Sequence, residues 1–190
     1  PMADDDAPMI WCSPDPRGVI EFDAFHASRR LLRTCRSGLF SATCDQDFEG
    51  VIRGCATAPG RVHQTWLTRP MLAAYLRMFK LGYAHSVEVW HEGRLAGGTY
   101  GIGLGGFFAA ESKFHCVRDA SKVALVHLVA HLRSRGYQLF DIQQVTPHTA
   151  SMGAVEIPRD EYLERLVHAL AQPVTFGDRL ESEAVLLRRD

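Results

Sequence analysis

Two acids and an amide, Glu111, Asp141 and Gln143, stand in segments that are otherwise apolar. Asp141 and Gln143 are two positions apart at the end of one apolar run, so on a strand both side chains would face the same side. Two carboxylates and an amide that converge can orient a reacting group or move its proton. The spacing therefore predicts a site. The alternative is that the two acids cap neighbouring backbone groups or pair with Lys113 and Arg118.

The elements that must position these side chains form a strand–helix–strand unit. Residues 107–114 and 137–142 are apolar enough for two strands, and the stripe of apolar residues between them predicts a helix. That helix should begin at Asp119 or Ser121 and end at Gly136. A β-α-β unit of this length predicts a right-handed crossover with parallel strands. Open α/β sheets bind ligands at the carboxyl ends of such strands.

The rest of the chain predicts further strands and helices. Residues 85–90 and 94–102 alternate as two strands joined by a tight turn at residues 92–93. The glycine-rich run at residues 101–106 joins two strands rather than opening a helix, so it is not a dinucleotide-binding motif. Further predictions are an edge strand at residues 19–22 and helices over residues 27–36, 45–56, 68–81 and 158–171.

The patterns give no support for a metal site or a hydrolase triad. His127 and His131 have helical spacing, but Leu128 stands where a zinc-protease motif needs glutamate, so both are expected to be partly exposed. Ser112 lacks the glycines of a nucleophile elbow. We therefore predict no metal and no cofactor.

Composition bounds the class of protein. The 190 residues are 46% hydrophobic, which is enough for one domain with a full core. The formal charge of −1 gives no overall signature of nucleic-acid binding. Five irregularly spaced cysteines without a CxxC pair favour a reducing cytoplasm over a disulfide framework. The sequence shows no apolar run long enough to span a membrane and no signal peptide.

One local segment is basic. Arg29, Arg33 and Arg36 fall on one side of the helix predicted over residues 27–36, with Arg30 adjacent. Such a face is usually solvated, but it could also hold the phosphates of a nucleic acid without reading its sequence.

A series of ordered motifs resembles the leucyl/phenylalanyl-tRNA–protein transferases. The resemblance covers residues 11–170. Its motifs are AESKF at residues 110–114, DASKVALVHLV at 119–129, LFDIQ at 139–143 and HTASMGAVEIPR at 148–159, with WCSPDPRGVI, FHASR, TW and AHSVEVW in order upstream.

The resemblance implies an α+β, GNAT-like fold, in which helices flank a mixed sheet with a central β-α-β unit. It implies an aminoacyl transferase domain over residues 11–172, between a disordered lead at residues 1–10 and a C-terminal tail at residues 173–190. The chain is expected to be a short form that lacks the N-terminal domain of the family.

The resemblance also implies the activity, which is transfer of leucine or phenylalanine from charged tRNA to the N-terminal amine of a protein in the N-degron pathway. It assigns Asp141 and Gln143 to the transfer step and Glu111 to positioning of the acceptor. Asp141 could be a base or an electrostatic support. The implied partners are the 3′ end and acceptor stem of aminoacyl-tRNA and the acceptor N-terminus, in the cytoplasm and without a membrane.

The substrates would need a pocket and a basic surface. The expected substrate-binding residues are Trp66, Tyr75, Phe108, Ser112, Thr99 and Lys113, and the expected tRNA-binding residues are Arg29, Arg30, Arg33, Arg36 and Arg17. Thr99 and Lys113 stand where the family carries methionines. Either the pocket is more polar than is usual in the family, which would alter the preference for leucine or phenylalanine, or Lys113 points outward.

Two other functions fit parts of the pattern. A GNAT-type acyl-CoA N-acyltransferase needs a glycine loop at a helix N-terminus to hold pyrophosphate, and residues 114–121 contain no glycine. A non-catalytic tRNA- or peptide-binding module would have no need for Asp141 and Gln143 together. The combination with Glu111 favours an enzyme.

Overall fold

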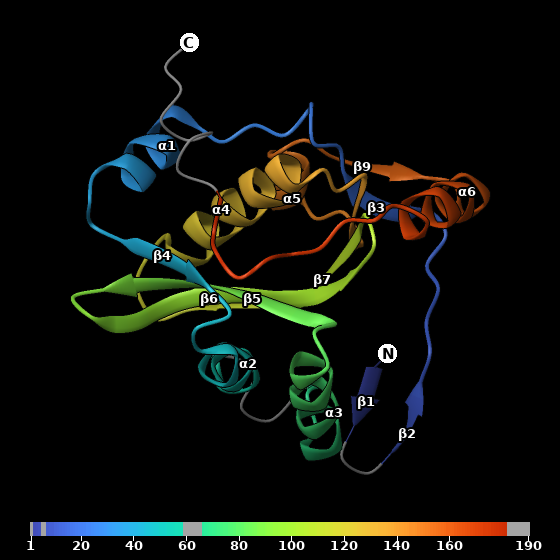
Figure 1. Ribbon diagram of the computed structural model, residues 1–190, viewed down its shortest axis with the longest axis horizontal. Coiled ribbons are helices and arrows are strands. Elements are labelled where there is room, and N and C mark those ends of the chain that lie inside the picture. The colour runs from blue at the N-terminus through green and yellow to red at the C-terminus, as the bar shows by residue number, and fades with distance from the viewer. Residues whose placement is uncertain (1, 5–6, 59–65, 182–190) are drawn as a thin grey trace.

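The computed structural model describes residues 2–4, 7–58 and 66–181, and its main feature is a seven-stranded mixed sheet in the order β4-β5-β6-β7-β8-β3-β9 (Figure 1). The elements are β1 Met2–Asp4, β2 Ala7–Ile10, β3 Arg17–Ile20, α1 Arg29–Arg36, β4 Ser41–Cys44, α2 Phe48–Thr57, α3 Arg69–Lys80, β5 Ala84–His91, β6 Arg94–Leu104, β7 Phe107–His115, α4 Ala120–Arg135, β8 Leu139–Gln143, α5 Pro147–Ala150, β9 Ala154–Ile157 and α6 Arg159–Leu170.

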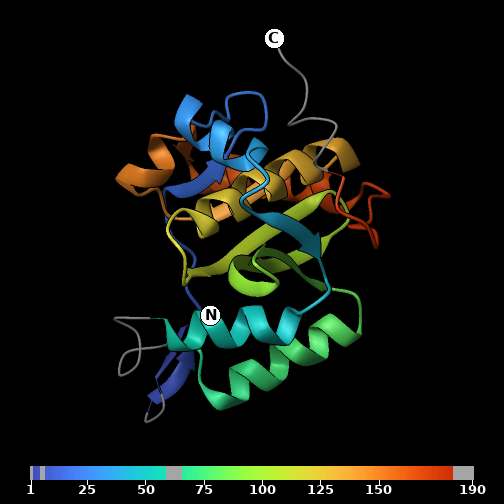
Figure 2. The same ribbon diagram turned by 90° about the vertical axis from the view of Figure 1, so that its left-hand side faces the viewer.

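Helices cover both faces of this α+β sheet. α4 packs on one face with α1 next to it, and α2 and α3 lie side by side on the other (Figure 2). Ala109 of β7 shares an apolar cluster with Tyr162 of α6, whereas Phe108 packs with Leu128 of α4. Since neighbouring residues of a strand face opposite sides, α6 and α4 lie on opposite faces.

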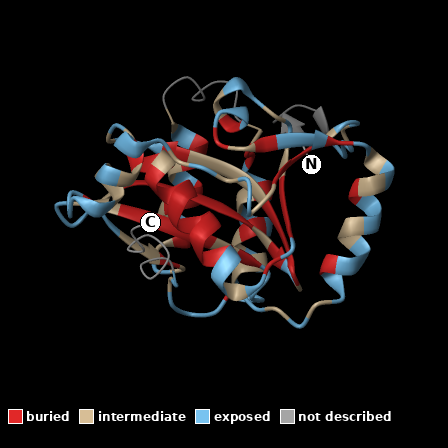
Figure 3. Cartoon of the chain, turned by 90° about the horizontal axis from the view of Figure 1, so that it is seen from above, coloured by how far each residue is buried: buried red, intermediate tan, exposed pale blue. Residues whose placement is uncertain are grey.

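The predicted β-α-β unit is confirmed. β7 and β8 pair in parallel, α4 connects them, and Gly136 ends the helix in the left-handed conformation with φ 85°. Asp119 occupies the N-cap position but makes no capping hydrogen bond with its side chain. Figure 3 shows α4 buried along most of its length.

The burial of α4 corrects one prediction. His127 and His131 were expected to be partly exposed, but both are buried. For His131 the reason is the segment at residues 173–181, which crosses the helix and places Phe176 in the core. His131 contacts this segment with both ring nitrogens, one 2.9 Å from the Phe176 carbonyl oxygen and one 3.0 Å from the Glu181 amide nitrogen.

The strand predictions hold for the hairpins, and for the strand predicted at residues 19–22 only the place in the sheet is wrong. β5, β6 and β7 pair antiparallel in turn, and the predicted turn contains Glu92 and Gly93 with φ 51° and 72°. The strand predicted at the sheet edge is instead β3, which pairs with β8 on one side and β9 on the other. Both pairings are distant in sequence, so local alternation could not reveal them.

Parts of the predicted lead at residues 1–10 and of the predicted tail at residues 173–190 are ordered. β1 and β2, within the predicted disordered lead, pair as a two-stranded sheet. Residues 173–181 of the predicted tail pack on the domain through Phe176. The other parts of those two predictions, at residues 1, 5–6 and 182–190, lie outside the described residues.

Candidate functional site

A cleft of about 310 Å³ opens where the two parallel strands diverge. The last paired residues of β7 and β8 are Ala109 and Asp141, and beyond them the strands separate. The cleft therefore lies at the carboxyl ends of these strands, as the sequence predicted. Its lining residues are Ile20, Trp66, Thr99, Ala110, Glu111, Ser112, Lys113, Leu125, Ile142, Gln143, Gln144, Thr146, His148 and Thr149.

A β-bulge shapes the β7 wall of the cleft. Tyr100 of β6 pairs with Ser112 and Gly101 pairs with Ala110, which leaves Glu111 as the extra residue. The bulge reverses the alternation of β7: Phe114 packs with the α2–α3 cluster, and His115 lies 3.3 Å from the Ser121 hydroxyl on α4.

Glu111 sits in a polar corner of the cleft. Burial raises the pKa of its carboxyl, and the negative charge of Asp141 adds to the rise, while the Tyr75 hydroxyl and Arg17 act in the opposite direction. The Tyr75 hydroxyl is buried and makes no hydrogen bond of normal geometry with a described residue. Burial is the main cause that raises the pKa of Tyr75, and the nearby Glu111 carboxyl raises it further.

Asp141 is fully buried and does not line the cleft. One carboxylate oxygen accepts from Arg17 Nε at 3.0 Å and from the backbone N–H of Gln143 at 2.8 Å. The other oxygen accepts from an Arg17 Nη atom at 2.6 Å and from the Tyr162 hydroxyl at 2.8 Å. These four hydrogen bonds use the acceptor positions of an ionised carboxylate.

Gln143 projects into the cleft because it leaves the strand geometry. Its φ of 62° is left-handed, a conformation that costs a non-glycine residue ~1–2 kcal/mol, and the hydrogen bond to Asp141 holds it. The predicted common face for Asp141 and Gln143 is therefore wrong. The Gln143 Nε2 donates to the Ala110 carbonyl oxygen at 2.8 Å. Since a carbonyl needs a donor, this bond fixes the amide orientation and leaves Oε1 for the cleft.

The predicted substrate-binding residues divide into two groups. Trp66, Thr99, Ser112 and Lys113 line the cleft. The Thr99 hydroxyl donates to the Ser112 carbonyl oxygen at 3.0 Å, so its polar atom is already bonded. Tyr75 lies behind the wall, with its ring 6.4 Å from that of Trp66.

Phe108 is a correction to the predicted substrate-binding set. It is 1% exposed and packs against Tyr137, Phe140 and Phe176 in the core, because the unbulged part of β7 turns it toward α4. A direct substrate contact by Phe108 is not compatible with that position.

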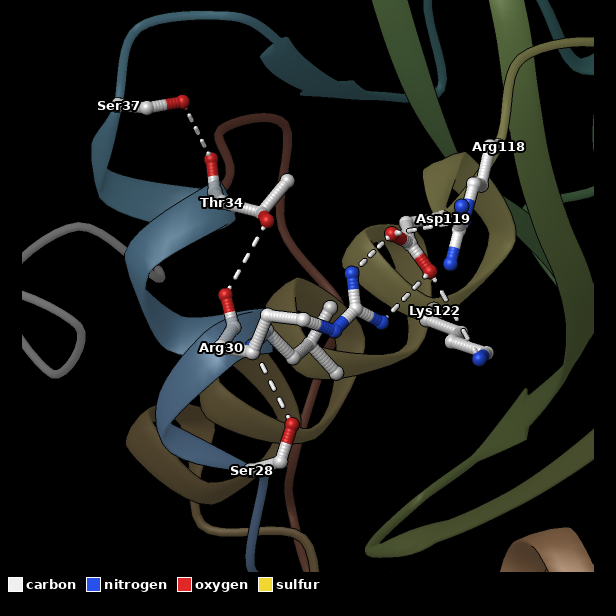
Figure 4. Close-up of polar contacts among 8 residues, drawn as sticks. Ser28, Arg30, Thr34, Ser37, Arg118, Asp119 and Lys122 are labelled. Atoms are coloured by element: carbon white, nitrogen blue, oxygen red, sulfur yellow. Dashed lines mark hydrogen bonds and ion pairs between the residues drawn. The ribbon is translucent and has the colours of Figure 1, made fainter.

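The predicted tRNA-binding arginines also divide. Arg29, Arg30, Arg33 and Arg36 are exposed on α1, which Ser28 caps by accepting from the Leu31 amide. Arg30 donates to both carboxylate oxygens of Asp119, at 2.6 and 3.1 Å (Figure 4). The hydrogen bond from Arg30 is the main cause that lowers the pKa of Asp119.

Arg17 does not fit the predicted phosphate contact. Its side chain is 13% exposed, and it pairs with Asp141 over the ring of Tyr162. Burial alone would lower the pKa of Arg17, but the hydrogen bonds and charge of Asp141 raise it. Arg17 is therefore a structural partner of Asp141.

Sequence reasoning missed several residues of the site. Tyr162 is one of them: its hydroxyl donates to Asp141, a role that the apolar pattern of the helix over residues 158–171 does not indicate. His148 and Thr149 line the cleft, and they belong to the motif at residues 148–159, so that motif was the available signal.

Within residues 2–4, 7–58 and 66–181, no group of three histidine, cysteine or acidic side chains is placed to hold a metal ion. In the same part of the chain no helix has the length and apolar character needed to cross a membrane.

Comparison with known proteins gives consistent relatives. The family described as "Leucyl/phenylalanyl-tRNA protein transferase" matches residues 19–167. Two proteins named leucyl/phenylalanyl-tRNA–protein transferase are similar to this chain. They come from Rhodopseudomonas palustris (strain HaA2) and Phenylobacterium zucineum (strain HLK1). The first is 48% identical, over 95% of this chain and 87% of its own. The second is 51% identical, over 93% of this chain and 80% of its own.

A solved structure shares the fold. The C-terminal domain of a proposed lysylphosphatidylglycerol synthetase from Agrobacterium fabrum superposes with a TM-score of 0.50 at 13% identity, covering 84% of this chain and 54% of that one. The extent and identity of the sequence matches decide the family. The chain belongs to the leucyl/phenylalanyl-tRNA protein transferases.

Proposed function

We propose that this enzyme transfers leucine or phenylalanine from charged tRNA to the N-terminal amine of a protein, and that transfer takes place in the cleft between β7 and β8. Membership of the family supports the activity. The observation that supports the location is the Gln143 amide, whose Nε2 is fixed by the Ala110 carbonyl and whose Oε1 is left for a donor in the cleft.

The reaction needs positioning more than activation. The amine nitrogen attacks the ester carbonyl carbon, a peptide bond forms, and the bond from that carbon to the ribose oxygen breaks. Gln143 Oε1 accepts a hydrogen bond from the attacking amine and so directs its lone pair at the carbonyl. An amide oxygen is too weak a base to keep the proton, which passes to the departing ribose oxygen.

Asp141 acts in this proposal as a positioning residue. Its carboxylate is buried behind the cleft and already accepts four hydrogen bonds, so it has no free position for a substrate proton. Its hydrogen bond from the backbone N–H of Gln143 holds the left-handed backbone conformation that directs the Gln143 side chain into the cleft. This assignment favours electrostatic and structural support over general-base catalysis.

Glu111 is proposed to hold the acceptor. It lines the cleft together with Gln143, and its carboxylate would pair with the cationic form of the incoming amine and take up the proton that this amine loses before it attacks. A buried carboxyl with a raised pKa gains from such a partner, because a nearby positive charge favours its ionised form. The basic face of α1, formed by Arg29, Arg30, Arg33 and Arg36, is proposed to contact the acceptor stem.

We also infer a GNAT-like architecture and a cytoplasmic location. The divergence of β7 and β8 after a β-bulge supports the first, since it opens the sheet at the reacting centre. A requirement for charged tRNA supports the second. The absence of glycine in residues 114–121 argues against a CoA-dependent acyltransferase.

A transfer assay with a panel of charged tRNAs and peptides that differ only at their first residue tests the function. Because Glu111 makes the cleft acidic, transfer of leucine or phenylalanine is expected to favour peptides with a basic first residue, arginine or lysine. Transfer of another amino acid would assign a different specificity to the pocket that contains Thr99 and Lys113. No transfer from any charged tRNA would refute the proposal.

A further inference from the structure

Three nitrogen-bearing side chains converge on one lip of the cleft from three different elements. Lys113 of β7 and His148 of α5 line the cleft, and Lys122 of α4 lies one helical turn before the lining residue Leu125. Residues three apart on a helix are neighbours, so Lys122 borders the cleft beside Leu125. Burial lowers the pKa of His148, and the positive charges of Lys113 and Lys122 lower it further. We call Lys113, Lys122 and His148 the cationic lip.

Local structure explains why these residues meet. The bulge at Glu111 reverses the alternation of β7, so Lys113 faces α4 instead of α2 and α3. His148 is the second residue of α5, whose first turn is fixed by a capping box between Thr146 and Thr149. The lip is therefore built on ordered elements.

The positive charge continues beyond the lip. Arg30 donates to both oxygens of Asp119, while Lys122 and Arg118 lie 3.7 and 3.9 Å from the same carboxylate. Three cations around one acid leave two positive charges in excess. Figure 4 shows Lys122 of α4, and Arg118 from the turn before α4, on the side of Asp119 away from α1. A band of positive charge thus connects the cleft with the basic face of α1.

We propose that the cationic lip binds the phosphodiester that joins the last two nucleotides of the tRNA 3′ end, immediately next to the reacting ester. This proposal rests on the proposed function, since it concerns the donor substrate. The two ammonium groups of the lip suit a single phosphate as point charges, and the imidazole suits it as a hydrogen-bond donor. A neutral imidazole still donates through one ring N–H, so the low pKa of His148 does not prevent the contact.

Position favours a phosphodiester over other anions. The terminal ester must reach Gln143 inside the cleft, while the acceptor stem reaches α1 outside it. The single-stranded end that joins them has to leave the cleft along a wall, and the cationic lip provides a positive wall in the direction of α1. Affinity gained here would be independent of base sequence.

Two small donors isolate this contact. One is leucyl-adenosine, which has no phosphate, and the other is leucyl-cytidylyl-adenosine, which has one phosphodiester. Transfer to an arginine peptide is measured with each donor and with intact charged tRNA, for the wild type, Lys122→Ala, Lys113→Met and His148→Gln. Lys80→Ala, which removes an exposed lysine from α3, is the matched control, and thermal melting checks that each variant folds.

The wild type and Lys80→Ala are expected to have a KM for the dinucleotide donor about tenfold lower than for leucyl-adenosine. A tenfold rise in salt should reduce that preference about fivefold, the dependence of one phosphate contact on a single strand. Lys122→Ala should reduce the preference to about twofold and leave kcat and KM for leucyl-adenosine unchanged. With intact tRNA, Lys122→Ala should raise KM and flatten its salt dependence.

The outcomes separate the two proposals. If Lys122→Ala loses the same transfer activity with both small donors, the lip has a structural role. If Lys122→Ala leaves KM and its salt dependence unchanged with intact tRNA, the lip binds no phosphate. Either result overturns the inference. Wild-type protein that transfers from intact tRNA preserves the proposed function in those cases. Wild-type protein that transfers from no donor refutes the proposed function itself.

Discussion

Replacing Asp141 with asparagine tests the network behind the cleft. The change keeps the shape of the side chain but removes its charge and turns one acceptor into a donor. Arg17, Tyr162 and the Gln143 amide all donate to this carboxylate. In the variant, one carboxamide oxygen cannot satisfy all three, and the amide NH₂ must face another donor.

The magnitude follows from burial. Asp141 is 0% exposed and the Arg17 side chain is 13% exposed, so water can compensate little for the lost partner. Removing one member of a buried ion pair costs ~3–5 kcal/mol. In a chain of this size each kcal/mol lowers Tm by about 2–4 °C, so the variant should melt ~6–20 °C below the wild type.

Thermal and urea unfolding followed by circular dichroism measure this difference. Asp178→Asn is the matched control, because Asp178 is exposed, and it should change stability by less than about 0.5 kcal/mol. Arg17→Met combined with Asp141→Asn should cost less than the sum of the single changes. A loss below about 1 kcal/mol for Asp141→Asn would refute the view that this carboxylate holds the network together.

Three further predictions concern other parts of the chain. Burial raises the pKa of Glu88, so ionisation of this carboxyl lowers the free energy of unfolding. The wild type should therefore lose stability relative to Glu88→Gln as pH rises above about 4.3. Urea midpoints that differ by a constant amount between the two proteins from pH 4 to 9 would contradict this. Arg29→Glu with Arg33→Glu should weaken binding of charged tRNA and flatten its salt dependence, with Tm unchanged, as filter binding can show. Trp66→Ala removes a ring on which the terminal base can stack and should raise KM for charged tRNA about 5- to 150-fold; an unchanged KM would exclude such a contact.

The sequence predicted the elements whose signals are local. Alternation with a turn at Glu92 and Gly93 predicted the β5–β6 hairpin, and Gly136 predicted the end of α4. The β-α-β pattern also located the carboxyl ends of two parallel strands, and a cleft lies there. In each case a few adjacent residues determine the conformation.

Non-local contacts decided what the sequence could not predict. Arg17 and Asp141 are 124 positions apart, and only the pairing of β3 with β8 brings them together. The direction of Gln143 depends on its left-handed φ, which strand periodicity does not anticipate. The burial of His131 depends on Phe176, from a segment that has no periodic pattern of its own.

The measurement that tests the central claim most directly is single-turnover transfer of leucine from charged tRNA to an arginine peptide by the wild type and Gln143→Ala. The account predicts a loss of about 100-fold or more in rate, because Oε1 no longer orients the attacking amine, while charged tRNA still binds and the protein stays folded. A rate for Gln143→Ala within a fewfold of the wild type would contradict it.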